Sequence, residues 1–185
     1  MEWVVIGAIV LIVLYVIFIY NRLVSLRQTV SQSWSDISVQ LKQRHDLIPN
    51  LVETVKGYAA HERGTLDAVV KARNAAVAAS GPADQAKAEN MLTGALRQLF
   101  ALSEAYPDLK ANQNFLALQS ELSDIENKIA AARRFFNNAV SEYNAAIQQF
   151  PAVLLAGTLG FAERTFFELD EAERAAVEAT PQVKF

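Results

Sequence analysis

Both histidines of the chain and two glutamates lie within residues 44–62, RHDLIPNLVETVKGYAAHE, and this stretch is the best equipped for chemistry. A zinc site of the helical metalloprotease type needs two histidines four residues apart with a glutamate between them. His45 and His61 are sixteen residues apart, and His61–Glu62 has no second histidine nearby. A hydrolase using His61 and Glu62 is an enzyme hypothesis, but a polar face or bundle edge is the favoured place for both histidines.

Other kinds of active site are also missing from the pattern. The chain has no cysteine, which excludes disulfides, thiolate metal sites and cysteine nucleophiles. No Gly-x-Ser-x-Gly elbow and no phosphate-cradling glycine loop occurs. The sequence therefore predicts a non-enzymatic protein with no catalytic residues, no metal and no cofactor.

The composition favours a helical protein with a packed core. Of 185 residues, 52% are hydrophobic and 20% charged, and only 7 Gly and 5 Pro interrupt the helix formers. The net charge is −3 and no basic run is present, so nucleic acid is not an expected partner.

Residues 3–20 form an uncharged stretch long enough, at about 27 Å of helix, to cross the hydrocarbon core of a bilayer. A buried core helix and a cleaved signal peptide are the alternatives. Glu2 precedes the stretch and no Ala-x-Ala site follows it, which favours an uncleaved anchor. The predicted membrane-spanning residues are Trp3, Val4, Val5, Ile6, Gly7, Ala8, Ile9, Val10, Leu11, Ile12, Val13, Leu14, Tyr15, Val16, Ile17, Phe18, Ile19 and Tyr20.

The charges around the span predict its orientation. Arg22, Arg27, Lys42 and Arg44 follow the span, and no Lys or Arg precedes it. The positive-inside rule then places the N-terminus outside and the bundle in the cytoplasm. The opposite orientation stays open because only Arg22 and Arg27 are close to the span.

The rest of the chain predicts a long antiparallel four-helix bundle continuous with the span, so the fold class is all-α. One helix is expected to run to residue 79, about 115 Å from residue 3, followed by helices over 83–105 and 111–149, the last with a near-heptad, coiled-coil-like period. The expected inward positions are Leu23, Leu26, Val30, Trp34, Ile37, Leu41, Ile48, Leu51, Val55, Leu66, Val69 and Val70, then Met91, Leu92, Ala95, Leu99 and Leu102, then Phe115, Leu118, Leu122, Ile125, Ile129, Ala132, Phe136, Val140, Tyr143 and Ile147. The outer face of 111–149, with Glu121, Glu126, Lys128, Arg133 and Arg134, is expected to be solvated.

The C-terminal part predicts an apolar segment and an acidic helix. An amphipathic helix is expected over 162–178, with Phe166, Phe167 and Leu169 on one face and an acidic opposite face. The expected domains are an anchor at 1–22, a bundle at 23–179 and a frayed tail at 180–185.

Pro49 stands inside the first predicted helix, where it removes a backbone hydrogen bond. The helix either kinks at 45–49 and continues, or Asp46 caps a new helix and forms a hairpin. The apolar register continues through Ile48 and Leu51, which favours the kink.

The stretch HDLIPNLVETVKGYAAHE resembles the signature of the LemA proteins, a family of bacterial membrane proteins. Further matching positions run in order along nearly the whole chain. They include Tyr20-Asn21, Trp34, Val39-Gln40-Leu41, Ala72-Arg73-Asn74, Tyr106 to Asn112, Ala132-Arg133-Arg134, Tyr143-Asn144, Phe150-Pro151, Gly160-Phe161 and Phe166-Phe167. The sequence departs from the family pattern at Ser38, where Asp is expected, and at Phe136, where Tyr is expected. The resemblance implies a single N-terminal anchor and a four-helix bundle. It implies no established enzymatic activity, and some relatives are implicated in organising internal membranes.

Two segments are candidates for contacts with partners. Tyr106 to Asn112 is either a recognition loop or an ordinary turn in which Asp108 caps the next helix. FPAVLLAGTLGF, residues 150–161, is either a buried helix or a membrane or protein interface, and its small residues favour an interface. The candidate interface residues are Pro151, Ala152, Val153, Leu154, Leu155, Gly157, Leu159, Gly160 and Phe161.

Together these features predict a membrane-anchored scaffold that contacts lipid, self-assembles into a high-order homo-oligomer and organises the membrane or associated proteins. The alternative is an adaptor that recruits another membrane or cytoplasmic protein through the acidic 162–178 face.

Overall fold

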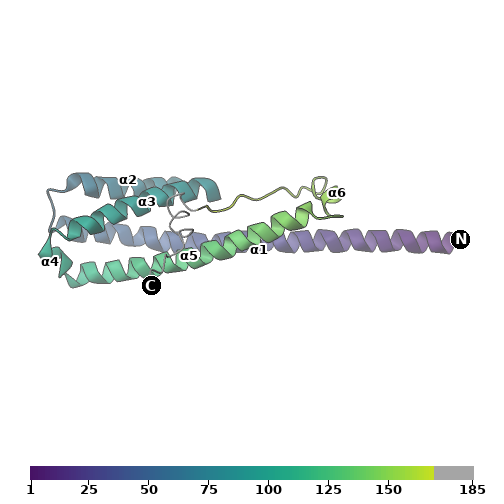
Figure 1. The fold of residues 1–185 in the computed structure, drawn as a ribbon, viewed down its shortest axis with the longest axis horizontal. Helices are drawn as coiled ribbons and strands as arrows, with labels where there is room; N and C mark the ends of the chain where they lie inside the picture. The colour runs from purple at the N-terminus through teal and green to yellow at the C-terminus, as the bar shows by residue number, and fades with distance from the viewer. Residues whose placement is uncertain (169–185) are drawn as a thin grey trace, which may run out of the picture. The chain divides into compact units, whose positions relative to one another are not determined.

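The computed structural model describes residues 1–168, whose regular elements are all helices, with no β-strand in this range (Figure 1). The all-α prediction is confirmed. The elements in this range are α1 (Glu2–Lys56), α2 (Arg63–Ala78), α3 (Pro82–Ser103), α4 (Pro107–Lys110), α5 (Gln113–Gln148) and α6 (Val153–Ala156).

The described chain divides into two compact units. The anchor unit comprises residues 1–37 and 132–165, and the bundle unit comprises residues 38–131 and 166–168. Helices α1 and α5 each contribute to both units, because each continues across a unit boundary. The predicted domain limits at residues 22 and 179 differ from this division and stay a prediction.

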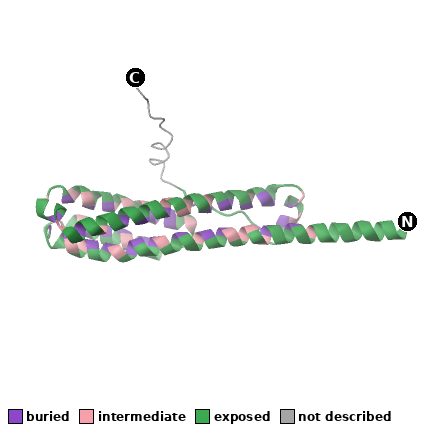
Figure 2. Ribbon diagram, turned by 90° about the horizontal axis from the view of Figure 1, so that it is seen from below, coloured by how far each residue is buried: buried purple, intermediate pink, exposed green. Residues whose placement is uncertain are grey.

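In the anchor unit, α1 begins with an apolar stretch that is long enough to cross a membrane (Figure 2). Between residues 3 and 20 only Ile19 is buried. The predicted stripe then packs as expected, with Leu23 and Val30 of α1 and Val140 of α5 buried. The Trp34 and Phe136 rings lie 5.4 Å apart, so these two helices are in direct contact within the unit.

In the bundle unit, the end of α1, α2, α3 and the start of α5 surround one apolar core. Turns of a few residues join α1 to α2 and α2 to α3, as in antiparallel bundles (Figure 1). The core residues are Ile48, Leu51, Val55, Ala59, Leu66, Val69, Ala72, Ala76, Ala88, Leu92, Leu96, Leu99, Leu109, Phe115 and Leu122.

The prediction of one helix from residue 3 to 79 is wrong. Helix α1 ends at Lys56, and α2 begins only at Arg63. Gly57 has low helix propensity, and the N–H groups of Tyr58 and Ala59 both bond the carbonyl of Val55, which closes a turn. Burial of Ala59 in the core holds that turn in place.

Three smaller expectations also fail. Met91 is 64% exposed, with Leu96 in the inward position on α3 instead, and Val70 of α2 is 39% exposed. For residues 150–161 the alternative of a buried helix does not form, because only the single turn α6 is helical and several of their apolar side chains are exposed. Residues 162–168 form no helix, and the remainder of the predicted 162–178 helix and the 180–185 tail lie outside the described residues.

Candidate functional site

A charged cluster lies inside the bundle unit, centred on the carboxylate of Glu89. Arg44 Nη1 donates to Glu89 Oε2 at 3.1 Å, and His45 Nε2 lies 2.6 Å from Glu89 Oε1. An ionised carboxylate only accepts hydrogen bonds, so this contact suits the imidazole tautomer with its N–H at Nε2. Gln85 Nε2 donates to the same Oε1 at 2.9 Å, and all four side chains are buried.

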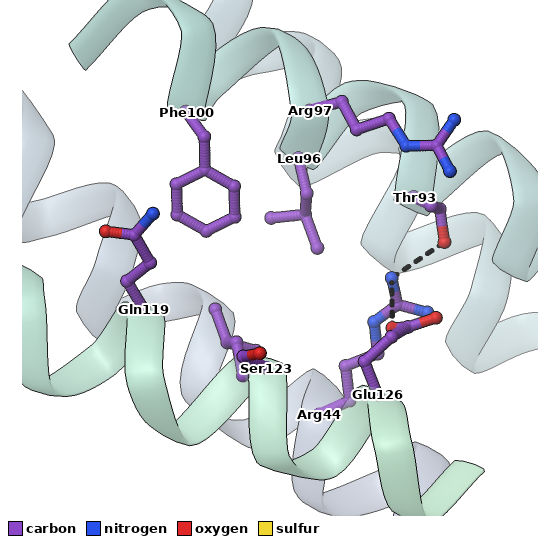
Figure 3. Close-up of a pocket in the computed structure, with 9 residues that line it drawn as sticks. Arg44, Thr93, Leu96, Arg97, Phe100, Gln119, Ser123 and Glu126 are labelled. Carbon is purple, nitrogen blue, oxygen red and sulfur yellow. Dashed lines mark hydrogen bonds and ion pairs between the residues drawn. The ribbon is translucent and has the colours of Figure 1, made fainter. Parts of the chain in front are cut away.

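The cluster extends to α5 through Arg44. Its Nη2 donates to Thr93 Oγ1 at 2.8 Å and pairs with Glu126 Oε2 of α5 at 3.2 Å (Figure 3). Glu126 is exposed, as predicted for the outer face of α5, and its half-exposed side chain also forms this ion pair. The expected polar face or bundle edge is wrong for His45, which is buried, whereas His61 is exposed.

Arg73 of α2 explains how α1 accommodates Pro49. Helix α1 continues through Pro49 to Lys56, so the hairpin with an Asp46 cap does not form. Proline has no N–H, which leaves the carbonyl of residue 45 without its helical donor. Arg73 Nε donates to the His45 carbonyl at 2.9 Å and replaces that donor. The kink at Pro49 itself stays a prediction.

The chemistry available to this cluster is limited by its own hydrogen bonds. Both oxygens of Glu89 already accept from buried donors, so neither is a vacant base. Among residues 1–168 no group of three metal-ligating side chains occurs. Gln85 Nε2 also donates to the Ala76 carbonyl of α2 at 2.9 Å, so the cluster links α1, α2, α3 and α5. Fixing the register of helices is the best attested role of buried polar groups.

A cavity of about 350 Å³ borders the cluster between α3 and α5. In Figure 3, Phe100 and Leu96 form one side of it and Gln119 and Ser123 face them, with Arg44 and Glu126 at one end. The lining of the cavity thus combines apolar side chains with positively and negatively charged ones. Arg44, at this end, is already bound to its partners.

The segment from Tyr106 to Asn112 is an ordered turn. It contains α4, whose Leu109 is buried. The predicted cap at Asp108 is wrong, because Asn112 Oδ1 accepts from the Phe115 N–H at 3.0 Å and caps α5. Burial raises the pKa of the Tyr106 phenol, and its hydrogen bond to Glu62 and the charge of that carboxylate raise it further.

The candidate interface, residues 150–161, belongs to the anchor unit. It forms an exposed turn that ends in the buried residue Phe161. Gly160 has φ of +76°, a conformation that favours glycine, and it lets the Phe161 N–H bond the Ala156 carbonyl at 2.9 Å. This turn buries Phe161, whose ring centroid lies 5.7 Å from that of Tyr20. Ala152 and Ala156 are also buried, whereas Phe150, Val153 and Leu154 are exposed.

Side chains of α5 hold the residues that follow. Tyr143 donates its hydroxyl to the Ala162 carbonyl at 3.0 Å. Asn144 donates to the Arg164 carbonyl and accepts from the Arg164 N–H, both at 2.9 Å. Asn144 thus fixes a neighbouring chain segment within the unit, and the Tyr143-Asn144 pair gains a definite structural role.

Sequence reasoning missed Gln85, Glu89 and Arg73. A signal was present for the first two, because residues 85, 89, 92, 96 and 99 follow one helical stripe and the last three are leucines. Polar residues at core positions of a stripe indicate a buried network. Nothing in the sequence pairs Arg73 with the carbonyl of residue 45.

Comparison with known proteins places these features in context. The model of the LemA family matches residues 33–185. The chain is 26% identical to the magnetosome protein MamQ of Magnetospirillum gryphiswaldense over 190 residues, covering 89% of this chain and 70% of the relative. It is 27% identical to the protein LemA of Metamycoplasma hominis over 164 residues, covering 86% of this chain and 74% of the relative.

Proposed function

The chain belongs to the LemA family, and on that premise we propose that it is a membrane-anchored scaffold that self-assembles and organises the membrane or associated membrane proteins without enzymatic chemistry. The observation that carries the proposal is the N-terminal part of α1. Its uncharged residues 3–20 leave large apolar side chains exposed, yet they are continuous with the helix that builds both folded units. Such a surface requires lipid around it.

Two further observations support a role in assembly. The charged cluster uses its ionisable groups for internal contacts, which leaves them unsuited to catalysis. The relatives at 26% identity in Magnetospirillum gryphiswaldense and Paramagnetospirillum magneticum are magnetosome proteins, and by analogy this chain would act in a membrane-bound assembly. The orientation proposed is the one that the positive-inside rule gives, with the bundle in the cytoplasm of a bacterium and the anchor in its inner membrane.

The test is the particle mass of the full-length chain in mild detergent, beside a variant that lacks residues 1–20. A large and uniform particle for the full-length chain is the expected result. If only the full-length chain assembles, the contacts involve the anchor. A monomer in both cases would refute the scaffold.

The adaptor alternative depends on an amphipathic acidic helix at 162–178. Residues 162–168, the part of this segment that the structure describes, form no helix, and this favours the scaffold. Charge reversal at Glu168, Asp170 and Glu171 tests the alternative directly, because an adaptor would lose its partner in a pull-down and a scaffold would retain its particle mass.

A further inference from the structure

Residues 150–161, here called the juxtamembrane segment, carry an apolar surface that the anchor unit does not cover. Phe150 is 80% exposed, Leu154 66%, Val153 49% and Leu159 37%. The segment contains no charged residue. Four large apolar side chains within ten residues form a cluster of the kind that marks a contact with lipid or protein.

The position of the segment indicates which of these it contacts. Phe161 packs edge-on against Tyr20, the last residue of the predicted span, and the guanidinium of Arg27 lies 5.0 Å from the centre of the Phe161 ring. Ile19 is only 7% exposed, so neighbouring residues of the unit cover part of the last turn of the predicted span. Figure 1 and Figure 2 both show the turn containing α6 beside α1.

The segment is also held firmly in that place. It begins where α5 ends, and the residues just beyond it are bonded back to α5 through Tyr143, Asn144 and Gln148. Aromatic rings and cations at the end of a span mark the boundary between hydrocarbon and headgroups. The apolar side chains of the segment are therefore fixed at the depth of that boundary.

We infer that the juxtamembrane segment inserts its apolar side chains into the lipid interface beside the span, as a second membrane contact of the anchor unit. A second copy of the chain is the less suitable occupant, because stable protein interfaces take roughly 20–30 residues a side and the exposed cluster has four. This inference rests on the proposed membrane anchorage and adds a contact that the anchor alone does not supply.

The absence of cysteine allows a test with single labels on the full-length chain. Leu154→Cys probes the segment and Leu11→Cys probes the span. Phe135→Cys is the matched control, because Phe135 is also a large exposed apolar residue of the anchor unit, at 57%. Its neighbour Phe136 contacts Trp34, which lies about 21 Å along α1 from Tyr20.

Each variant is labelled with an environment-sensitive fluorophore and reconstituted in vesicles of phosphatidylethanolamine and phosphatidylglycerol. Circular dichroism first verifies that the three proteins have equal helicity. Emission is then quenched by lipids that carry a spin label either near the headgroup or near the middle of the acyl chain, or by iodide in the water. The expected result is blue-shifted emission and lipid quenching at positions 154 and 11, with iodide quenching at 135.

The other outcomes overturn the inference in distinguishable ways. If position 154 behaves like 135 while position 11 is quenched by lipid, the anchor stands and the second contact is refuted. If position 154 is protected from both quenchers, the segment contacts protein instead. If position 11 is quenched by iodide, the membrane anchorage is wrong, and the proposed function and this inference fail together.

Discussion

The bundle unit buries charge, whereas the anchor unit exposes apolar side chains. Arg44, His45 and Glu89 are removed from water inside the bundle unit, and each has a partner at hydrogen-bond distance. Phe150 and Leu154 of the anchor unit are largely exposed and belong to the same unit as the apolar stretch of α1 that is long enough to cross a membrane. Both regions depart from the ordinary distribution of residues between core and surface.

The difference teaches how to recognise an internal contact and an external one. Buried charges are tolerated only when the protein itself supplies every partner, and the bundle unit does this from four helices. Clustered apolar side chains that stay exposed are not covered by the protein itself, so we expect the partner that covers them to come from outside the chain. The first region therefore bears on stability and the second on association.

The largest effect is expected from removing the centre of the charged cluster. Glu89→Gln leaves the buried Arg44 without its closest counter-charge, and breaking a buried pair costs about 3–5 kcal/mol. Urea unfolding of the full-length chain in detergent, followed by circular dichroism, measures the free energy of unfolding. Glu121→Gln, an exposed change on α5, is the control, and equal losses in both variants would contradict the role of the cluster.

A smaller loss is expected at Arg73. Arg73→Leu leaves the His45 carbonyl without a donor, at a cost of about 1–3 kcal/mol. In a Pro49→Ala background the cost should fall, because the restored N–H of residue 49 can bond that carbonyl. A double-mutant cycle of unfolding free energies measures the coupling. Strictly additive costs would show that Arg73 does not compensate for Pro49, and the exposed Lys71→Leu serves as the control.

Within the anchor unit, Asn144→Ala should act locally. The change removes both hydrogen bonds to the Arg164 backbone. Because the site is exposed, each bond contributes no more than about 0.5–1.5 kcal/mol to the free energy of unfolding. Hydrogen exchange should show faster exchange of the Arg164 amide, with unchanged protection in the bundle unit. The exposed Asn138→Ala on the same helix should leave that amide unaffected.

The raised pKa of Tyr106 predicts a modest alkaline effect in the bundle unit. The unfolded phenol loses its proton near the ordinary pKa of 10.0, before the folded one does. The free energy of unfolding is therefore unaffected by this group below pH 10 and falls as the pH rises towards the folded pKa. Tyr106→Phe should remove this fall, which thermal unfolding at a series of alkaline pH values would detect. Identical slopes in both proteins would show that the pKa of Tyr106 is not raised in the folded chain.

The smallest effect on stability is expected at the exposed apolar surface. Leu154→Ser should change the free energy of unfolding by less than about 0.5 kcal/mol, because the side chain is mostly outside the core. The same detergent unfolding assay applies, with Leu92→Ser in the buried core of the bundle unit as the contrasting variant. A large loss at position 154 would mean that the segment supports the fold rather than an external contact.

The sequence by itself determined the helices, the apolar span and most of the inward stripe. These features depend on periodicity and local propensity, which are properties of neighbouring residues. That is why Leu23, Val30 and Val140 could be placed correctly, and why a break could be placed between residues 79 and 83, where Gly81 has a positive φ. Gly57 gave a weaker local signal, and the length of the first helix was overestimated.

Only the tertiary structure decided how polar groups find partners and where the apolar segment lies. Arg73 and the His45 carbonyl are 28 residues apart, and Arg44 and Glu89 are 45 apart. Such pairs form because the packing of whole helices brings them together, which no local pattern specifies. In the same way, the sequence shows that residues 150–161 are apolar, but the contact of Phe161 with Tyr20 places them beside the span.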